Sequence, residues 1–374
     1  MKIRIGITGQ NGFIGSHLYH TIRLLKEEFV LVDFDRLWFA QDDAMDAFVK
    51  QCDVIVHLAA LNRHHNPSQL LDTNISLVIK LINALERTHS NPQIVFSSST
   101  QEFQENHYAR SKKEGRILLA DWASKHGACF TGLIIPNVFG PFAKPFYNSV
   151  VATFCYQIVN GQKPELITDA DLDLIYIGEL VEVIIEKIRS QENNLGYTVL
   201  HTSQIKVSAM LTMLRYFEAS YLNEGTIPLL GGNKFDLNLL NTFRSYINPE
   251  TYFPQKYISH ADDRGVFVEL IRNYNGGQVS FSTTLPGKIR GNHFHTRKIE
   301  RFMVIKGIAQ VQLRKIGTNE IIQLELSGAQ PAYVDIPVWC THNLINIGIE
   351  PLITVFWISE LYNPNDPDTF FELV

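Results

Sequence analysis

The chain has 374 residues, 45% of them hydrophobic, and a formal net charge of −5. Its length exceeds the ~250–300 residues at which one hydrophobic core stops growing, so we expect two domains. The net negative charge offers no basic footprint, which excludes nucleic acid as a partner. No apolar run reaches the roughly 18–20 residues that span a bilayer, and the chain starts on a strand rather than a signal peptide. The four cysteines show no CxxC pairing, so we expect reduced thiols and a cytoplasmic protein without membrane association.

A glycine-rich turn follows the first strand. The apolar run KIRIGIT leads into TGQNGFIG at residues 8–15, with a helix expected at 16–25 and a second strand at 29–34. The first glycine permits the tight turn, the second lets the backbone approach a pyrophosphate, and the third allows close packing of the helix. The amides and dipole at the start of that helix favour phosphate. The pattern predicts a dinucleotide site, rather than a turn without ligand, formed by Gly9, Gly12, Phe13, Ile14 and Gly15.

Two later strands end in residues that suit a cofactor. The run DVIVHLAA at 53–60 is expected to be a buried strand whose end, Leu58-Ala59-Ala60, allows close backbone approach. The run IVFSSS at 94–99 is a further buried strand with serines at its carboxyl end. Ligands of open α/β sheets bind at the carboxyl ends of the strands. We therefore expect both strand ends at the cofactor site.

Tyr108 and Lys112 are four residues apart and share one face of an expected helix. A nearby ammonium favours the phenolate form of a tyrosine. Lys112 should therefore lower the pKa of Tyr108 and make it a usable proton donor near neutral pH.

Together, TGxxGxxG, the SSS strand end and YxxxK resemble the extended short-chain dehydrogenase/reductase family over roughly residues 1–245. The resemblance implies that Ser99, the third serine, orients the substrate carbonyl in preference to Ser98. It also implies that Tyr108 is the general acid and that Lys112 holds the nicotinamide ribose. The segment between Ser99 and Tyr108 is shorter than in typical sugar epimerases of the family, so we expect an abbreviated substrate loop.

The resemblance also bears on the substrate and on the choice of coenzyme. Asn137, in IIPNVFGP, matches the family's Asn-x-x-Gly-Pro stretch that holds substrate, with a loop cap as the alternative. At the end of the second strand, Asp33 and Asp35 would suit the ribose of NAD, whereas Arg36 would suit the 2′-phosphate of NADP. Related enzymes use NADPH, so we place Arg36 on that phosphate.

The pattern of elements changes near residue 250. Alternating strands and helices run to about residue 190, followed by an expected turn at 193–196 and helical stretches at 207–222 and 235–248. Residues 248–254 are interpreted as a linker. From residue 257, short strands separated by turns indicate an antiparallel barrel or sandwich. We predict an α/β, Rossmann-type doubly wound domain over 1–245 and an all-β domain over 246–374.

The all-β region contains a candidate metal site. In GKIRGNHFHTRKIERFMVIKG at 287–307, His293 and His295 are two residues apart, so they point to one face of a strand, and Glu300 follows a short turn. His342 could arrive from another strand. Three imidazoles and a carboxylate suit a divalent metal with open positions. The alternative is a set of unrelated strand histidines satisfied by backbone groups.

This arrangement resembles the two-part signature of the cupins, which are small β-barrels. Trp339 stands where a glycine is usual in the second part. The stretch DDRGVFVE at 262–269 is similar to the D-x-R-G-x-F stretch of nucleotide-sugar 3,5-epimerases, themselves cupins. That likeness implies that Arg264 binds a substrate phosphate, with Phe267 packing near it. A hairpin turn with a surface arginine is the alternative.

The pairing of the two domains resembles the bifunctional epimerase–reductases of capsular polysaccharide synthesis. It implies that the cupin inverts C3 of a UDP-linked 2-acetamido-2,6-dideoxy-4-hexulose, with a metal ion, expected to be zinc, bound by His293, His295, Glu300 and His342. The reductase domain then reduces the C4 ketone with NADPH, toward UDP-2-acetamido-2,6-dideoxy-L-talose, the precursor of UDP-N-acetyl-L-fucosamine. A homodimer is expected. Lys298 and Tyr333 are candidates for the C3 base, with solvated or rim positions as the alternative.

Two other functions compete with this one. The cupin could be a non-catalytic dimerisation or sugar-sensing module attached to a reductase, although a scaffold has no need of converging ligands. Alternatively, the first domain could be an epimerase or dehydratase with tightly bound NAD, which would not consume NADPH.

Overall fold

The computed structural model describes residues 2–63, 65–263, 265–272 and 275–374. The chain divides into two compact units. Unit 1 comprises Met1–Phe139, Ala143–Val150 and Thr168–Val207, and unit 2 comprises Gly140–Phe142, Val151–Ile167 and Ser208–Val374. Residues 208–245, which the sequence assigned to the first domain, therefore group with the C-terminal strands. None of the described helices combines the length and hydropathy needed to cross a membrane.

Unit 1 is built on a six-stranded parallel sheet with the order β2-β1-β3-β4-β5-β8. Its central strands are continuous apolar runs because both faces of a parallel sheet are covered. Strand β1 has β2 on one side and β3 on the other, which makes its carboxyl end the switch point where cofactors bind in such sheets. The strands are β1 (Ile3–Thr8), β2 (Phe29–Val32), β3 (Val54–His57), β4 (Gln93–Ser99), β5 (Phe130–Ile135) and β8 (Asn194–Thr198).

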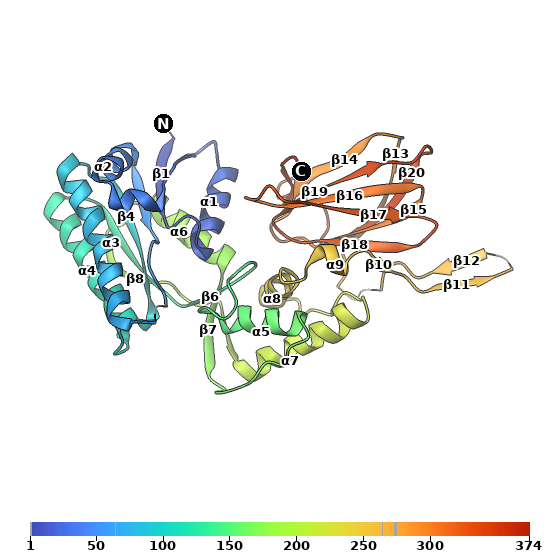
Figure 1. The fold of residues 1–374 in the computed structure, drawn as a ribbon, viewed down its shortest axis with the longest axis horizontal. Coiled ribbons are helices and arrows are strands. Elements are labelled where there is room, and N and C mark those ends of the chain that lie inside the picture. The colour runs from blue at the N-terminus through green and yellow to red at the C-terminus, as the bar shows by residue number, and fades with distance from the viewer. Residues whose placement is uncertain (1, 64, 264, 273–274) are drawn as a thin grey trace. The chain divides into compact units, whose positions relative to one another are not determined.

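Helices pack on both faces of this sheet. Helices α2, α3 and α4 lie together on one face, and α1 and α6 contact each other on the other face (Figure 1). A core of Phe48, Leu81, Phe96, Leu119 and Trp122 is buried beneath the first group. The helices are α1 (Phe13–Leu24), α2 (Asp42–Gln51), α3 (Pro67–Thr88), α4 (His107–His126) and α6 (Ile177–Ser190), with 3-10 turns η1 (Arg36–Ala40) and η2 (Thr100–Phe103).

Two features of unit 1 extend the expected pattern. A small sheet, ordered β6-β7-β9, joins β6 (Asn137–Phe139), β7 (Asp171–Tyr176) and β9 (Ser203–Lys206). The turn expected at 193–196 is instead the start of strand β8. Pairing of β8 with β5 outweighs the local turn preference of its asparagine and glycine residues.

The strands of unit 2 form two five-stranded antiparallel sheets, ordered β10-β18-β15-β20-β13 and β17-β16-β19-β14-β21, and a separate hairpin, β11-β12. Apolar residues including Met303, Val311, Val334 and Leu352 form the core of the unit. The predicted fold class, a Rossmann-type sheet followed by an all-β barrel, is confirmed. The strands are β10 (Gln255–Lys256), β11 (Ser259–Asp262), β12 (Gly265–Val268), β13 (Gln278–Thr284), β14 (Ile289–Phe294), β15 (Glu300–Lys306), β16 (Ile308–Lys315), β17 (Ile321–Ser327), β18 (Ala332–Ile336), β19 (Cys340–Asn346), β20 (Leu352–Ile358) and β21 (Phe370–Phe371).

Unit 2 also has a helical part that is attached to the barrel by buried charges. Arg301 of β15 makes two hydrogen bonds to Asp335 of β18, at 2.7 and 2.9 Å, and the Tyr221 hydroxyl donates to the same carboxylate at 2.6 Å. Arg244 donates to the Ile336 carbonyl at 3.0 Å. Helices and strands therefore share one polar core. The helices are α5 (Val150–Val159), α7 (Val207–Phe217), the π-helical η3 (Glu218–Asn223), α8 (Lys234–Arg244) and α9 (Pro249–Tyr252), the last within the expected linker.

Candidate active sites

The glycine-rich turn of unit 1 is closely packed. Gly9 has φ +79°, and a Cβ atom there would lie 2.8 Å from the Ala59 nitrogen. A Cβ on Gly15 would lie 2.2 Å from the Gly9 carbonyl oxygen. Helix α1 begins at Phe13 with neither a side-chain cap nor an acidic residue in its first turn. Its N-terminal amides and dipole therefore suit an anionic ligand, and the residues fit the pyrophosphate of a dinucleotide.

The end of β3 is joined to this turn. The Leu58 amide donates to the Thr8 carbonyl at 3.1 Å, and the Ala59 amide lies 3.4 Å from the Thr8 hydroxyl. Leu58, Ala59 and Ala60 are all half-buried. The structure therefore brings the predicted strand end alongside the glycine-rich turn.

The residues proposed for coenzyme selection follow β2. The Asp35 carboxylate accepts from the Leu37 amide at 2.8 Å and so caps η1. Asp33 and Arg36 are exposed, and within the described part of the chain no hydrogen bond or ion pair engages the Arg36 guanidinium. The Gln10 side chain, from the glycine-rich turn, donates to the Phe34 carbonyl at 2.8 Å. Arg36 is thus close in sequence to a segment that is attached to the predicted dinucleotide site.

Lys112 and Tyr108 lie near each other at the start of α4. The Asn106 side chain caps this helix by accepting from the Ala109 amide at 2.8 Å. The Lys112 ammonium lies 5.9 Å from the centre of the Tyr108 ring and donates to the Ser97 carbonyl at 2.8 Å. Burial lowers the pKa of Lys112 to about 8. The pair therefore lies beside the serine-rich end of β4.

The pKa of Tyr108 differs from the expectation. Burial raises it to about 12, with a smaller contribution from Tyr147. The sequence argument gave the opposite direction, because it counted the charge of Lys112 but not the desolvation of the phenolate. At neutral pH, Tyr108 is therefore a protonated phenol.

The serines at the end of β4 have different environments. The Ser98 hydroxyl is buried and donates to Glu102, whereas Ser99 accepts from the Gln101 amide at 3.2 Å as the cap of η2. Side-chain alternation places Ser99 on the same face as Ser97, the residue that Lys112 contacts. Ser99 stays the candidate for orienting the substrate carbonyl.

Glu102 was not anticipated from the sequence. Its side chain is fully buried and forms an ion pair with Arg116, with 2.6 Å between Nη2 and Oε1. An acidic residue within the abbreviated segment between Ser99 and Tyr108 was the signal that could have identified it. Its bonds to Ser98 and Arg116 attach the segment between Ser99 and Tyr108 to β4 and α4.

Asn137 and Arg264 are the two residues predicted to bind substrate, and only Asn137 lies within the described residues. Asn137 is the exposed first residue of β6, and its side chain makes no hydrogen bond within the described residues, so it forms no loop cap there. Arg264 lies outside the described residues. Asn137 stays a candidate for binding substrate.

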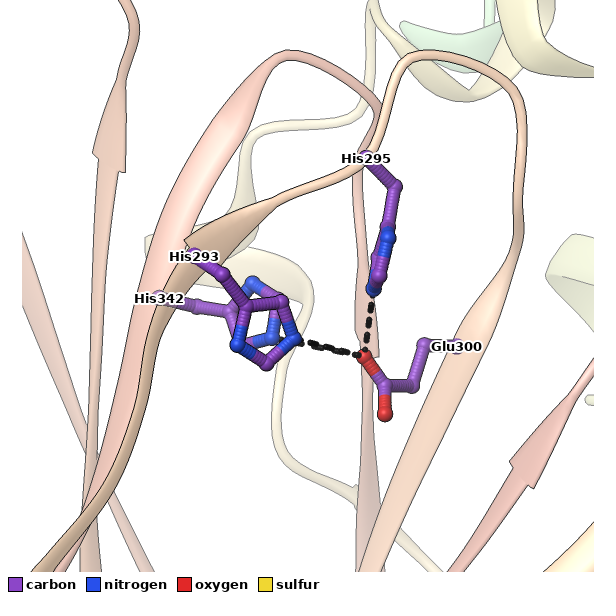
Figure 2. A group of neighbouring side chains, drawn as sticks. All are labelled: His293, His295, Glu300 and His342. Atoms are coloured by element: carbon purple, nitrogen blue, oxygen red, sulfur yellow. Dashed lines mark hydrogen bonds and ion pairs between the residues drawn. The ribbon is translucent and has the colours of Figure 1, made fainter. Parts of the chain in front are cut away.

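The predicted metal ligands converge in unit 2 (Figure 2). One ligand atom from each of the four residues lies within 4.8 Å of the others. The Nε2 atoms of His293, His295 and His342 lie 3.9, 3.0 and 3.3 Å from the same oxygen, Oε2 of Glu300. Strands β14 and β19 pair His293 with His342, and Glu300 begins β15. The spacing read from the sequence therefore corresponds to a real cluster.

The electrostatics of the cluster suit a cation. Burial lowers the pKa of His293 to about 4. Burial alone would raise the pKa of Glu300, but the hydrogen bond from His295 and the neighbouring His342 bring it below its ordinary value. The Nε2 atom of His342 is fully buried. It lies 3.3 Å from Oε2 of Glu300, but the angle between the two groups does not allow a hydrogen bond. A carboxylate surrounded by imidazole nitrogens is a ligand set that fits zinc or a similar divalent ion.

Trp339 adopts the conformation of the glycine that is usual at its position. Its φ is +59°, in the left-handed region, and its amide donates to the His295 carbonyl at 2.7 Å. Its ring also packs against Phe294 at 5.6 Å between centroids. The departure from the cupin pattern is therefore accommodated without loss of the turn.

The two candidates for the C3 base are engaged elsewhere. Lys298 is buried, donates to the Pro367 carbonyl and lies 3.9 Å from the Glu360 carboxylate. The buried Tyr333 ring stacks 3.7 Å from the Arg301 guanidinium, and its hydroxyl lies 3.4 Å from the Gly225 carbonyl. Neither side chain belongs to the converging metal group.

Comparisons with known proteins agree with this architecture. Residues 5–199 match the model of the NAD dependent epimerase/dehydratase family, and residues 260–370 match that of the polysaccharide biosynthesis C-terminal domain. The structure of the capsular polysaccharide assembling protein CapF from Staphylococcus aureus is 32% identical, with all of both chains covered and a TM-score of 0.63.

Two curated proteins extend the comparison. The UDP-2-acetamido-2,6-beta-L-arabino-hexul-4-ose reductase of Pseudomonas aeruginosa is 29% identical over 371 residues, 98% of each chain. The spore coat polysaccharide biosynthesis protein SpsL of Bacillus subtilis is 30% identical over 124 residues, which are 30% of this chain and 82% of its own. The resemblance inferred from the sequence motifs is confirmed. The chain belongs to the NAD dependent epimerase/dehydratase family.

Proposed function

We propose that the chain is a bifunctional enzyme acting on a UDP-linked 2-acetamido-2,6-dideoxy-4-hexulose. It inverts C3 in unit 2 and reduces the C4 ketone with NADPH in unit 1, toward UDP-2-acetamido-2,6-dideoxy-L-talose. One observation carries the proposal: a single chain contains a dinucleotide-type glycine-rich turn, the Tyr108–Lys112 pair at the end of β4, and a largely buried cluster of three histidines and one glutamate. The relatives support it, because one is named as a UDP-sugar reductase and another as a capsular polysaccharide protein.

In unit 1, bound NADPH would supply the hydride to C4. Tyr108 would donate its phenolic proton to the C4 oxygen, giving an alcohol. Burial keeps that phenol protonated until transfer. The Lys112 ammonium, 5.9 Å from the ring, would stabilise the phenolate that remains, and Ser99 and Asn137 would orient the substrate.

Coenzyme choice in this proposal depends on Arg36. Its exposed guanidinium has no partner within the described residues, whereas the nearby Asp35 carboxylate is used to cap η1. A 2′-phosphate would give Arg36 a charge-assisted contact that NADH cannot give. We therefore favour NADPH over NADH.

In unit 2, a zinc ion held by His293, His295, Glu300 and His342 would supply a Lewis acid for the C4 ketone and thereby acidify the C3 proton. The chain's own contribution is a largely buried ligand set, since three of the four ligands are nearly fully buried. His293, Glu300 and His342 lie on strands, and His295 directly follows β14. Lys298 is held as a donor to Pro367 and as a partner of Glu360, so we do not assign it the role of base.

We further infer a cytoplasmic homodimer. The four cysteines are all free thiols, as expected in a reducing compartment. Strand β13 is at the edge of its sheet and exposes 58% of Val279 and 73% of Phe281. An edge strand with exposed apolar side chains can pair with a second copy of the chain. Light scattering on the purified chain would test the dimer.

Product analysis by NMR tests the proposed function. The UDP-4-ketosugar is incubated in D2O with the enzyme, with and without NADPH. Without NADPH, we expect deuterium at C3 and an unreduced ketone; with NADPH, we expect deuterium at C3 and a C4 alcohol. Reduction without C3 exchange would assign unit 2 a non-catalytic role. Turnover that consumes no NADPH, with NAD retained through purification, would assign the chain to the NAD-bound epimerases or dehydratases.

A further inference from the structure

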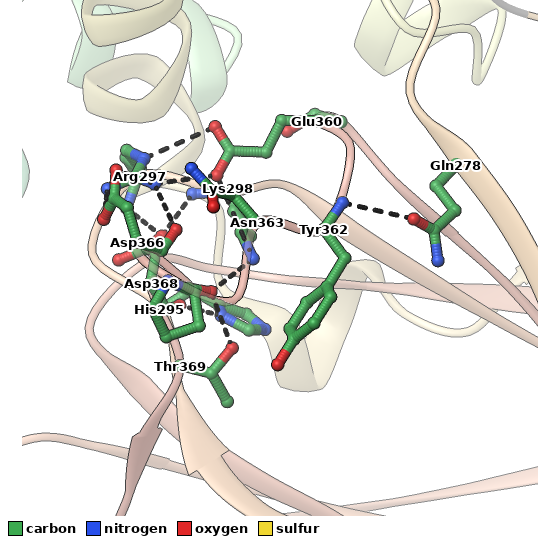
Figure 3. A network of polar contacts seen from close by, with 12 residues as sticks. Gln278, His295, Arg297, Lys298, Glu360, Tyr362, Asn363, Asp366, Asp368 and Thr369 are labelled. Atoms are coloured by element: carbon green, nitrogen blue, oxygen red, sulfur yellow. Dashed lines mark hydrogen bonds and ion pairs between the residues drawn. The ribbon is translucent and has the colours of Figure 1, made fainter.

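The last residues of the chain cover the turn that connects two metal ligands. We define the C-terminal strap as residues 359–374, which follow β20. Figure 3 shows part of the strap, including Asp366 and Asp368, beside His295, Arg297 and Lys298. The strap ends in β21, which pairs with β14 at His293. Contacts with the strap therefore reach both histidines of the HxH motif.

The backbone of Asp368 fixes the ring of His295. The His295 Nδ1 atom lies 2.5 Å from the Asp368 carbonyl oxygen. A carbonyl oxygen can only accept, so Nδ1 must carry a hydrogen, and Nε2 faces Glu300 at 3.0 Å. Histidines that bind metals are held in their tautomer by such a bond from the other ring nitrogen. The strap thus determines which nitrogen His295 presents to the metal group.

The carboxylate of Asp368 fixes the turn that follows His295. Its Oδ1 atom accepts from the Thr296 amide at 2.9 Å and the Thr296 hydroxyl at 2.6 Å. Its Oδ2 atom accepts from the amides of Arg297 at 3.1 Å and Lys298 at 3.0 Å. Three successive amides between His295 and Glu300 are therefore bound to one side chain, which is only 2% exposed.

Asp368 itself is held in an uncommon conformation. Its φ is +38°, in a region that residues other than glycine rarely adopt. Such conformations persist where surrounding contacts over-determine them, and they cluster at functional sites. The hydrogen bonds of its carbonyl and carboxylate to the turn supply those contacts.

Other residues of the strap bind the side chains of Arg297 and Lys298 in the same turn. The Arg297 guanidinium bonds to Glu360 at 3.0 Å and to Asp366 at 2.9 Å, and Lys298 donates to the Pro367 carbonyl. Asp366 is exposed, and its carboxylate contacts the Arg297 side chain. This residue shares the strap and the charge of Asp368 but not its bonds to the turn's amides, which makes it a matched control.

We propose that Asp368 is a positioning residue for the metal site. Its carboxylate holds the turn that follows His295 and thereby keeps the Asp368 carbonyl against Nδ1 of His295, the contact that sets the tautomer and orientation a divalent ion requires. The proposal rests on the metal site of the proposed function. It adds to that site a residue 73 positions from His295 in sequence. The strap therefore helps to hold the metal ligands in place.

The test measures Zn²⁺ binding by the full-length chain in competition with a chromophoric chelator. The proteins are the wild type, Asp368→Ala, Asp368→Asn and the control Asp366→Ala. Loss of a group that orients a metal ligand typically costs about 10–100-fold in metal affinity, and we expect that loss for Asp368→Ala. Asp368→Asn keeps one acceptor oxygen but turns an amide group toward backbone N–H donors, so an intermediate loss is expected. Asp366→Ala should bind Zn²⁺ within about twofold of the wild type. Asp366 contacts the Arg297 side chain but makes no bond to the amides of the turn.

A second readout separates ligand geometry from general destabilisation. With Co²⁺ in place of Zn²⁺, the visible absorption bands report the arrangement of the ligands. Both Asp368 variants should change these bands, and Asp366→Ala should not. If Asp368→Ala does not fold, as judged by near-ultraviolet circular dichroism, the isosteric Asp368→Asn decides the matter.

Two outcomes would overturn the proposal in distinguishable ways. Folded Asp368 variants that bind Zn²⁺ as tightly as the wild type, with unchanged Co²⁺ bands, would remove the positioning role and leave the metal site intact. A wild-type chain that takes up no Zn²⁺ would remove the metal site itself, and the positioning role with it.

Discussion

The Arg116 guanidinium makes two hydrogen bonds to the buried carboxylate of Glu102, with 2.6 Å between Nη2 and Oε1 and 3.0 Å between Nε and Oε2. The same carboxylate accepts from the Ser98 hydroxyl. The segment between Ser99 and Tyr108 is therefore attached to helix α4 through a charged pair whose acidic member is fully buried.

Glu102→Ala should be destabilising. The variant leaves the buried Ser98 hydroxyl without its acceptor and the partly exposed Arg116 without its partner, and an unsatisfied buried group costs about 1–3 kcal/mol in the free energy of unfolding. The measurement is urea unfolding. Glu114→Ala is the control, because the Arg110–Glu114 pair on the same helix is exposed and such pairs contribute about 0–1 kcal/mol. Equal losses in the two variants would contradict the assigned role of Glu102.

Tyr108→Phe should abolish C4 reduction but leave C3 proton exchange intact. The phenol serves only the reductase site, and phenylalanine preserves the shape of the ring. Coenzyme oxidation is followed by absorbance, and C3 exchange is followed by NMR in D2O. Loss of C3 exchange in the folded variant would mean that the two reactions share one site.

Reduction should also depend on the charge of Lys112. Its pKa is lowered to about 8 by burial, so it is protonated below that pH and loses its proton above it. We expect kcat/KM for reduction to be level below about pH 8 and to fall roughly tenfold per pH unit above it. A profile that stays level to pH 9.5 would show that a neutral Lys112 is sufficient.

Glu300→Gln should lower the metal content and abolish C3 exchange. The amide keeps the size of the side chain but removes the charge on which the three Nε2 atoms converge. Reduction of a substrate that already has the inverted C3 configuration should survive. Metal content is measured by mass spectrometry, and simultaneous loss of both activities in a folded variant would indicate one composite site.

Arg36→Ala should raise KM for NADPH by about one to two decades, because a hydrogen bond to a charged group contributes roughly 1.5–3 kcal/mol. Use of NADH should hold steady, which makes it the internal control. Steady-state kinetics with both coenzymes provide the measurement. An unchanged NADPH/NADH ratio would place the 2′-phosphate contact elsewhere or reassign the enzyme to NAD.

Motifs with short, fixed spacing could be predicted from the sequence. The HxH pair, Glu300 and distant His342 form one cluster, and the glycine-rich turn lies against the end of β3. The glycine-rich turn depends on a local strand–turn–helix pattern. The metal cluster is less local: His295 lies just beyond β14 rather than on it, and His342 is supplied by β19. The fold class followed from the same local signals.

Features that depend on tertiary burial could not be predicted. Asp368 contacts His295 across 73 residues, and no local pattern indicates such a contact. The pKa of Tyr108 is raised because burial, which the sequence does not reveal, disfavours the phenolate. The grouping of residues 208–245 with unit 2 likewise depends on the buried contacts of Tyr221 and Arg244.

The interleaving of the two units along the chain has a consequence for synthesis on the ribosome. Helix α5 belongs to unit 2, and its Tyr156 ring lies 6.4 Å from that of Tyr246. Chains grow at roughly 5–20 residues per second, so α5 emerges several seconds before this partner and longer still before the last barrel strands. The apolar face of α5 is exposed to solvent during that interval. Nascent chains stalled after α5 has left the ribosome, but before residues 208–245 have done so, should therefore recruit chaperones more strongly than the completed chain.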